Sequence, residues 1–177
     1  MTAAVMGGGS WGTIFAQVLC DAGTPAVLWC RRPEVADAIN ATRCNKDYLP
    51  DITLSASLRA TADPAEAVAG ADIVVLAVPS QTLRQNLLRW AGLIPPDALM
   101  VSLMKGIELD TCRRMSEVVA EAADWPGEQI AVVTGPNLGG RGRGSVVPSD
   151  GTAGETAGFE VSRSAMFSSA SMSGAPD

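Results

Sequence analysis

The first residues whose types and spacing suggest chemistry form a glycine-rich stretch near the N-terminus. Gly7-Gly8-Gly9-Ser10-Trp11-Gly12 contains the spacing Gly-x-Gly-x-x-Gly, directly after a short apolar run and before an amphipathic one. In this spacing the first glycine permits a tight turn, the second lets a pyrophosphate approach the backbone, and the third lets a helix and a strand pack closely. The first amides of the following helix would point at the phosphates, aided by the helix dipole. A flexible glycine loop is the alternative, but the position between a strand and a helix favours a dinucleotide site at Gly7, Gly9 and Gly12.

A pair of arginines stands where such a site meets the ribose. An Asp or Glu about 20 residues beyond the glycines would bind a 2′-hydroxyl and select NAD. The second apolar run ends instead in Trp29-Cys30-Arg31-Arg32. Two guanidinium groups can hold a 2′-phosphate or stack on adenine, so we expect Arg31 and Arg32 to favour NADP. The alternative is a pair of solvated arginines that begin a helix.

Lys105 is one of two lysines in the chain, and it follows an apolar run in Met104-Lys105-Gly106-Ile107-Glu108. The carboxyl ends of strands in a doubly wound sheet line the ligand crevice. A lysine there could bind a substrate phosphate or a carbonyl oxygen, although the spacing fits an ordinary exposed lysine equally well. Val78-Pro79-Ser80 and Gly135-Pro136-Asn137 follow two further apolar runs, so their loops would face the same crevice.

The elements that must position these residues alternate short apolar runs with longer amphipathic stretches. Nearly continuous apolar runs are typical of strands that are buried on both faces of a parallel sheet. The predicted strands are Ala3–Met6, Ala26–Cys30, Ile73–Val78, Leu99–Leu103 and Ile130–Thr134, and the predicted helices are Trp11–Ala22, Pro33–Ala41, Ser80–Trp90 and Leu109–Ala123, with a short one from Asp63-Pro64 through Val68. This βαβ pattern predicts an α/β fold of the Rossmann type, a doubly wound parallel sheet.

Composition excludes several classes of protein. The chain has no histidine, which excludes a Ser–His–Asp hydrolase, a His-ligated metal centre and imidazole acid–base chemistry. Thirteen basic against 19 acidic residues give a formal charge of −6, which argues against a nucleic-acid partner. No apolar run approaches the ~20 residues that cross a bilayer, and no basic residue precedes Arg31 as in a signal peptide. We expect a cytoplasmic protein with no metal and no membrane partner.

The four cysteines and the composition of the C-terminal segment indicate one folded domain. Cys20, Cys30, Cys44 and Cys112 form no Cys-x-x-Cys pair and are expected to be small core residues in a reducing compartment. The last 39 residues contain eight Gly and eight Ser but no Leu or Ile. Such a segment cannot offset the entropy of ordering its backbone, on the order of 1–2 kcal/mol per residue. We therefore expect a folded domain over 1–138 and a disordered Gly/Ser-rich tail over 139–177.

Several motifs taken together resemble bacterial NAD(P)-dependent glycerol-3-phosphate dehydrogenase. No single motif is specific, but the set occurs in order and with suitable spacing over residues 1–138. The motifs are Gly7 to Thr13, Leu28 to Arg32, Asn40 to Arg43, Tyr48 to Pro50, Ala77 to Gln81, Met104 to Glu108 and Gly135 to Leu138. The resemblance implies reversible reduction of dihydroxyacetone phosphate to sn-glycerol 3-phosphate, which feeds glycerophospholipid synthesis.

The resemblance also implies roles for individual residues. Ser10, Trp11, Arg31 and Arg32 would bind NADP or NAD, and Lys105 would contact both the cofactor and the substrate. Gly135 and Asn137 would contact the substrate, and Gly139 stands where the family has another cofactor contact. The expected partner is this small molecule, and self-association is left open.

The match to the family ends near Leu138. The family continues into a helical substrate domain that carries a Gly-x-Leu-Lys-Asn motif, whose lysine serves as the general acid. Gly139-Gly-Arg-Gly-Arg-Gly-Ser has no counterpart there, and no lysine follows Lys105. The change in composition resembles a shifted reading frame, and a different splice of coding sequence or a deliberate truncation would explain it too. Two other hypotheses therefore stand beside the dehydrogenase: a non-catalytic NAD(P)-binding fragment, and another two-domain dehydrogenase that acts on a 2-keto acid or a nucleotide sugar.

Overall fold

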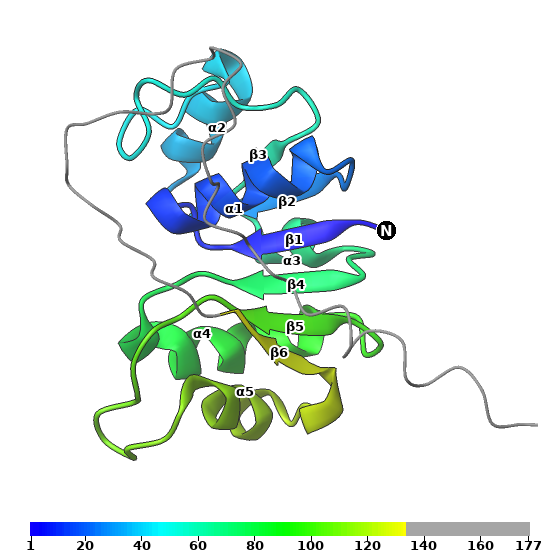
Figure 1. The fold of residues 1–177 in the computed structure, drawn as a ribbon, viewed down its shortest axis with the longest axis vertical. Helices are drawn as coiled ribbons and strands as arrows, with labels where there is room; N and C mark the ends of the chain where they lie inside the picture. Colours follow the sequence, from blue (N-terminus) through cyan, green and yellow to red (C-terminus); the bar gives the residue numbers. More distant parts are fainter. Residues whose placement is uncertain (134–177) are drawn as a thin grey trace, which may run out of the picture. The chain divides into compact units, whose positions relative to one another are not determined.

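A parallel sheet forms the centre of the computed structural model, which describes residues 1–133. Within these residues the strands lie in the order β3-β2-β1-β4-β5-β6, and every neighbouring pair is parallel (Figure 1). Their bounds are β1 Ala3–Met6, β2 Ala26–Trp29, β3 Arg59–Thr61, β4 Ile73–Leu76, β5 Leu99–Ser102 and β6 Ile130–Val132. The order of the strands reverses between β1 and β4, as in the Rossmann-type fold that the sequence predicts.

Helices cover both faces of this sheet. The described α-helices are α1 Ser10–Asp21, α2 Pro33–Thr42, α3 Pro64–Val68, α4 Leu83–Trp90 and α5 Met115–Ala123, with 3₁₀ turns η1 Ser80–Thr82, η2 Ala91–Leu93 and η3 Gly127–Gln129. Val5 of β1 packs in one cluster with α1 and α2, whereas its neighbours Ala4 and Met6 pack in another with α3, α4 and α5. Successive side chains of a strand point to opposite faces, so one apolar strand supplies both cores.

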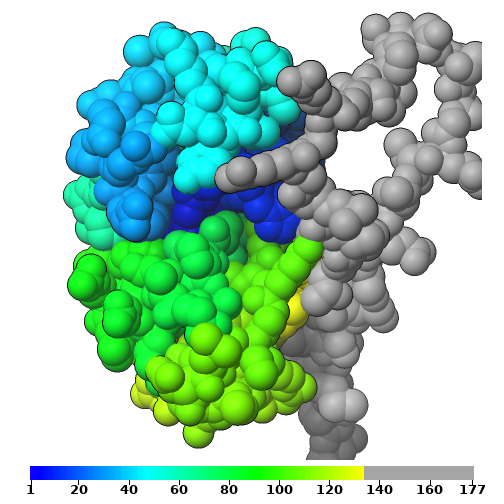
Figure 2. All heavy atoms as spheres, turned by 90° about the vertical axis from the view of Figure 1, so that its left-hand side faces the viewer, coloured from blue at the N-terminus to red at the C-terminus, as the bar shows by residue number. Residues whose placement is uncertain are grey.

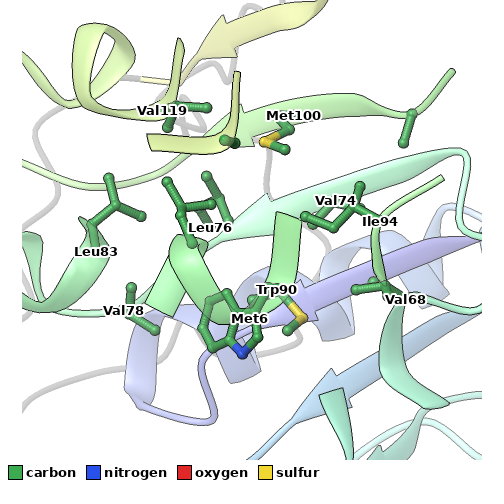
Figure 3. Close-up of a cluster of buried hydrophobic side chains, with 14 of the residues drawn as sticks. Met6, Val68, Val74, Leu76, Val78, Leu83, Trp90, Ile94, Met100 and Val119 are labelled. Atoms are coloured by element: carbon green, nitrogen blue, oxygen red, sulfur yellow. The ribbon is translucent and has the colours of Figure 1, made fainter. Parts of the chain in front are cut away.

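The hydrophobic core between the sheet and helices α4 and α5 extends to the carboxyl end of β2. Figure 3 shows Met6, Leu76 and Met100 from three neighbouring strands beside Trp90 of α4 and Val119 of α5. All five side chains are buried. Trp90 also contacts Trp29 at the end of β2 edge to face, with ring centroids 4.9 Å apart. The aromatic pair therefore joins this core to the carboxyl end of β2.

Most predicted elements are confirmed with small changes at their ends. β1 has the predicted bounds, β2 and β5 are one residue shorter, and β4 ends at Leu76 rather than Val78. The next residue packs closely against the glycine-rich stretch: the carbonyl of Ala77 would lie 2.4 Å from a Cβ on Gly7. β6 begins at Ile130 as predicted, and Thr134 lies outside the described residues.

The predicted helix Leu109–Ala123 is wrong over its first six residues. α5 begins at Met115, and the preceding segment folds back on itself through a left-handed residue at Cys112, with φ 54°. The amide of Glu108 donates to the carbonyl of Arg113 at 2.9 Å, and Ile107 pairs with Arg114 in an isolated antiparallel bridge. Leu109 is 73% exposed, so its apolar side chain does not belong to the core face of α5.

The prediction missed β3 because it is short and lies at the edge of the sheet. Ala60 pairs with Leu28 of β2 on one side. On the other side the Asn40 amide forms two hydrogen bonds to the backbone of Ala60, at 2.7 and 2.9 Å. Asn40 therefore bonds the outer backbone groups of β3 as a further strand would. A strand of three residues is then long enough to form at this edge.

The cysteines divide into two groups. Cys20 and Cys30 are buried as predicted, but Cys44 is half-buried and Cys112 is exposed, so the expectation that all four are core residues is wrong. Cys112 sits in the turn before α5, where the chain bends outward. Over residues 1–133 no helix is long and apolar enough to cross a bilayer, and no cluster of potential metal ligands occurs. The predicted boundary at 138 and the tail over 139–177 lie outside the described residues.

Candidate functional site

A pocket of about 1000 Å³ opens at the carboxyl end of the sheet. Figure 2 looks onto this end, where the dark blue N-terminal segment lies recessed between cyan atoms near residue 50 and green atoms that follow β4. The predicted site residues that line the pocket are Gly7, Gly9, Ser10, Trp11, Arg31, Arg32 and Lys105. Gly12 does not line it but packs behind the turn. The predicted substrate contacts Gly135 and Asn137, and also Gly139, lie outside the described residues.

Two of the glycines are required by close packing of the backbone. A Cβ on Gly12 would lie 1.9 Å from the carbonyl oxygen of Gly7, so α1 can approach β1 only with glycine at this position. Gly7 has φ 143°, and a Cβ there would lie 2.4 Å from the carbonyl of Ala77. These two contacts agree with the roles that the spacing predicts for the first and the third glycine.

Gly9 differs from both because nothing lies within 4 Å of its Cβ position. Its φ of −79° is open to any residue, so neither packing nor the local backbone requires a glycine there. The space beside Gly9 belongs to the pocket. A group from outside the chain, such as a pyrophosphate, fits this position at the surface of the backbone.

The beginning of α1 offers unpaired amides to the same space. Gly9 is the N-cap and has no side chain to cap the helix. Within residues 1–133, no backbone carbonyl accepts a hydrogen bond from the amides of Gly9, Ser10 or Trp11. Unpaired amides and the positive end of the helix dipole together form an anion site.

The pocket floor at the end of β2 is neutral and apolar. The Cys30 Sγ would lie 2.5 Å from a Cβ on Gly8, so the cysteine packs directly against the glycine turn. Burial raises the pKa of the Cys30 thiol to about 11. The thiol therefore stays protonated at neutral pH and acts as a packing group rather than as a nucleophile.

The two arginines at the rim of the pocket have different surroundings. Arg32 donates a hydrogen bond to Asp47, which raises the pKa of its guanidinium, and its Nε lies 3.8 Å from Oε1 of Glu34. Arg31 is exposed and forms no hydrogen bond or ion pair with another of residues 1–133. Arg31 thus keeps its full hydrogen-bonding capacity for a ligand, whereas Arg32 shares its own with two carboxylates.

The loop that carries Lys105 is fixed by a glutamine from the opposite turn. Nε2 of Gln81 donates to the carbonyl of Ile107 at 2.8 Å, and Oε1 accepts from the amide of Leu109 at 3.1 Å. Gln81 precedes α4, and Lys105 follows β5. The amide side chain therefore joins the loops after β4 and β5 on the side of the pocket that Lys105 lines.

A cluster of ion pairs ties the loop that carries Lys105 to α4 and α5. Arg84 of α4 binds both carboxylate oxygens of Glu108, each at 2.9 Å, and reaches Glu121 of α5 at 3.1 Å. The bond from Arg84, together with one from Thr111, lowers the pKa of the Glu108 carboxyl to about 2. Glu108 stays ionised under ordinary conditions and ties the loop to α4.

Sequence reasoning assigned no role to Gln81, Arg84, Asn45 or Glu108. Gln81 and Glu108 stand inside motifs that carry the resemblance, so their positions were marked but their contacts were not. Arg84 lies in a predicted helix and looks there like any surface arginine. Asn45 contacts Gly8, 37 residues earlier in the chain, and no periodicity marks such a contact.

Comparisons with known proteins show which family this chain belongs to. The family model described as NAD-dependent glycerol-3-phosphate dehydrogenase N-terminus matches residues 2–140. The chain is 61% identical over 136 residues to a glycerol-3-phosphate dehydrogenase [NAD(P)+] of Streptomyces avermitilis, covering 77% of this chain and 40% of that protein. It is 59% identical to the enzyme of Thermobifida fusca over 136 residues, with 76% and 40% covered.

Solved structures give the same result. Glycerol-3-phosphate dehydrogenase of Coxiella burnetii aligns with a TM-score of 0.70 and 31% identity, covering 78% of this chain and 42% of that one. The Saccharomyces cerevisiae enzyme aligns with a TM-score of 0.68 and 26% identity, again with 78% and 42% covered. The chain thus spans about two fifths of the length of the relatives that it matches. NAD or NADP is the cofactor of these relatives by name, as the glycine motif predicted. The chain belongs to the NAD-dependent glycerol-3-phosphate dehydrogenase family, whose N-terminal part its residues 2–140 match.

Proposed function

We propose that this chain binds NADP or NAD in the pocket and forms the cofactor-binding part of a dehydrogenase. The reaction is reduction of dihydroxyacetone phosphate to sn-glycerol 3-phosphate, and the dinucleotide supplies the hydride when bound. The observation that carries the proposal is the open space at Gly9, where nothing lies within 4 Å of the Cβ position, beside unpaired amides of α1. The names of the relatives support the choice of substrate.

Each predicted cofactor residue has a place in this proposal. The amides of Gly9, Ser10 and Trp11 hold the pyrophosphate, while Gly7 and Gly12 allow the turn that presents them. Arg31 and Arg32 bind the 2′-phosphate of NADP at the rim. The residues present fit the cofactor, because they offer donors and positive charge to an anionic ligand.

Lys105 lies on the other side of the pocket and is the proposed contact to the substrate. A cation there can bind the substrate phosphate or stabilise negative charge that develops on the carbonyl oxygen. Gly135 and Asn137 complete the substrate contacts by resemblance alone. The proposal includes a cofactor domain over residues 1–138 and a cytoplasmic location.

We further propose that the chain alone binds the dinucleotide without turning substrate over. Reduction of a carbonyl needs a proton donor that is held beside the oxygen. The family resemblance assigns this role to a lysine in a Gly-x-Leu-Lys-Asn motif, and the lysines of this chain are Lys46 and Lys105.

A titration with NADPH, followed by dihydroxyacetone phosphate, tests both parts. We expect a change in NADPH emission on binding and no loss of signal after the substrate is added. No emission change at any protein concentration would contradict the proposed cofactor site. Decay that depends on dihydroxyacetone phosphate would contradict the non-catalytic reading, and decay with a 2-keto acid instead would favour another two-domain dehydrogenase.

A further inference from the structure

Asn45 stands in the segment between α2 and β3, and its side chain has no role in the proposed function so far. Its carbonyl accepts hydrogen bonds from the amides of Tyr48 and Leu49, at 3.1 and 2.7 Å, which fixes its backbone in a turn. Its side chain points inward and only 1% of the residue is exposed. A buried amide that crosses from this segment to the glycine turn needs an explanation.

The Asn45 amide holds the glycine turn through two hydrogen bonds. Nδ2 donates to the carbonyl of Gly8 at 3.1 Å and to Oγ1 of Thr13 at 2.9 Å. Both hydrogens of Nδ2 are therefore used. Gly8 is thus in contact with both Asn45 and Cys30, whose Sγ would lie 2.5 Å from a Cβ on Gly8.

Thr13 holds the next carbonyl along the turn. Its amide donates to the carbonyl of Gly9 at 3.0 Å, and the residue is completely buried. The carbonyl of Gly8 is thus bound by the buried Asn45 side chain, and the carbonyl of Gly9 accepts the first backbone hydrogen bond of α1. In a planar trans peptide the carbonyl and the following N–H point in opposite directions. Binding both carbonyls to groups of the protein therefore leaves the amides of Gly9 and Ser10 for the pocket that both residues line.

The peptide between Gly8 and Gly9 is the one most in need of such a clamp. Glycine adopts right- and left-handed conformations with little difference in energy, so two adjacent glycines let this peptide rotate. A rotated peptide would present a carbonyl oxygen to the phosphates in place of an N–H. Asn45 also carries a buried Oδ1 with no recorded partner, an arrangement that opposes folding. The stabilising contribution of this side chain therefore comes from the two hydrogen bonds that Nδ2 donates.

We propose that Asn45 is a positioning residue for the pyrophosphate of the dinucleotide: it fixes the peptide of Gly8 and Gly9 so that the amides face the ligand. This inference rests on the proposed function. It predicts a loss of affinity that is common to NADPH and NADH, because both carry the same pyrophosphate. Loss of one clamping residue should weaken both by about tenfold, at the upper end of the net value of a neutral hydrogen bond.

The test titrates NADPH, NADH and ADP-ribose into the wild-type chain, Asn45→Ala and the matched control Asn40→Ala, with urea denaturation of each. Asn40 also binds backbone with its amide, but it does so at Ala60 and does not line the pocket. We expect all three ligands to weaken by about tenfold in Asn45→Ala with the NADPH/NADH ratio unchanged. Asn40→Ala should lose stability and keep its affinities. The amide resonances of Gly9 and Ser10 should shift on ligand binding in the wild type and shift less in Asn45→Ala.

The outcomes distinguish failure of this inference from failure of the proposed function. A wild-type chain that binds no dinucleotide would overturn both. Wild-type binding with unchanged affinity in Asn45→Ala, or equal losses in Asn40→Ala, would overturn the inference alone. If Asn45→Ala does not fold, Thr13→Val carries the test, because it removes the hydroxyl that anchors Nδ2. A drop of about threefold for every ligand is then expected, and unchanged affinities would overturn the inference.

Discussion

On one side of the pocket the glycine turn is held by buried, neutral hydrogen bonds. On the other side the loop with Lys105 is held by an ion pair and by exposed hydrogen bonds from Gln81. Asn45, which holds Gly8, is 1% exposed and carries no charge. Arg84, which holds Glu108, has a side chain that is 29% exposed, and the loop's other anchor, Gln81, is exposed. The difference teaches that the contacts of the glycine turn, the proposed phosphate side, do not depend on pH or salt. The loop of Lys105, the proposed substrate side, is held in part by charge.

Changing Gly12 should have the largest effect, because it breaks the phosphate side altogether. Gly12→Ala puts a Cβ 1.9 Å from the backbone oxygen of Gly7, which cannot move without separating α1 from β1. We expect NADPH affinity to fall at least a hundredfold and the free energy of unfolding to fall by roughly 1–3 kcal/mol. Calorimetric titration and urea denaturation measure the two. Gly92→Ala, where a Cβ meets open space, should leave both unchanged.

Charge enters the phosphate side at its rim, through two arginines with unequal surroundings. Arg31→Ala should weaken NADPH by about ten- to a hundredfold and NADH much less, because a charged hydrogen bond to the 2′-phosphate is worth about 1.5–3 kcal/mol. Arg32→Ala should have a smaller effect in the same direction, because Asp47 already occupies part of its guanidinium. Fluorescence titrations with both dinucleotides measure the ratio.

Arg59→Ala serves as the control for loss of a surface cation, since Arg59 pairs with Glu66 and does not line the pocket. Equal weakening of NADPH and NADH by Arg31→Ala would show that this arginine does not read the 2′-phosphate. A larger effect at Arg32 than at Arg31 would reverse the order proposed for the rim.

Acid should reduce the stability that ionised Glu108 gives to the loop of Lys105. The folded protein holds the pKa of Glu108 at about 2, against 4.5 for an unperturbed carboxyl. A lowered pKa means that the charged form stabilises the fold above pH 4.5, and that this contribution is lost as the pH falls toward 2. The difference in unfolding free energy between the wild type and Glu108→Gln should therefore narrow from pH 6 to pH 3. A difference that stays constant with pH would contradict this account.

The smallest effect is expected at Gln81, whose hydrogen bonds are exposed. Gln81→Ala frees the amide of Leu109, which donates to Oε1 at 3.1 Å in the wild type. We expect hydrogen exchange at Leu109 to quicken about fivefold, which corresponds to about 1 kcal/mol. Gln85→Ala, one turn further along, should leave that amide unchanged. Faster exchange in both variants would point to fraying of α4 rather than to loss of the clamp.

The sheet and the glycine turn could be predicted because their signals are local. Strands that are apolar at every position, such as β1, indicate a parallel sheet. The three glycines of the turn stand within six residues. The segment from Leu109 to Arg114 misled the prediction for the same reason. Its pattern continues that of α5, and only the return contacts to Glu108 and Ile107 break it.

The clamps could not be predicted, because their partners are far apart in the chain. Asn45 and Gly8 are 37 residues apart, and Gln81 and Ile107 are 26 apart. A sequence shows the donors and acceptors but not which of them meet. The resemblance to a family singled out the stretches around Gln81 and Glu108, and the structure supplies the contacts that they make.

The most direct test of the central claim is the substitution Gly9→Ala. The chain itself has room for this methyl group, since nothing lies within 4 Å of the Cβ position and φ is −79°. If that room is reserved for a pyrophosphate, the variant should keep its unfolding free energy within about 1 kcal/mol of the wild type. Its affinities for NADPH and NADH should each fall at least tenfold in the same titration. A variant that is equally stable and binds both dinucleotides as tightly as the wild type would contradict the placement of the cofactor at the head of α1.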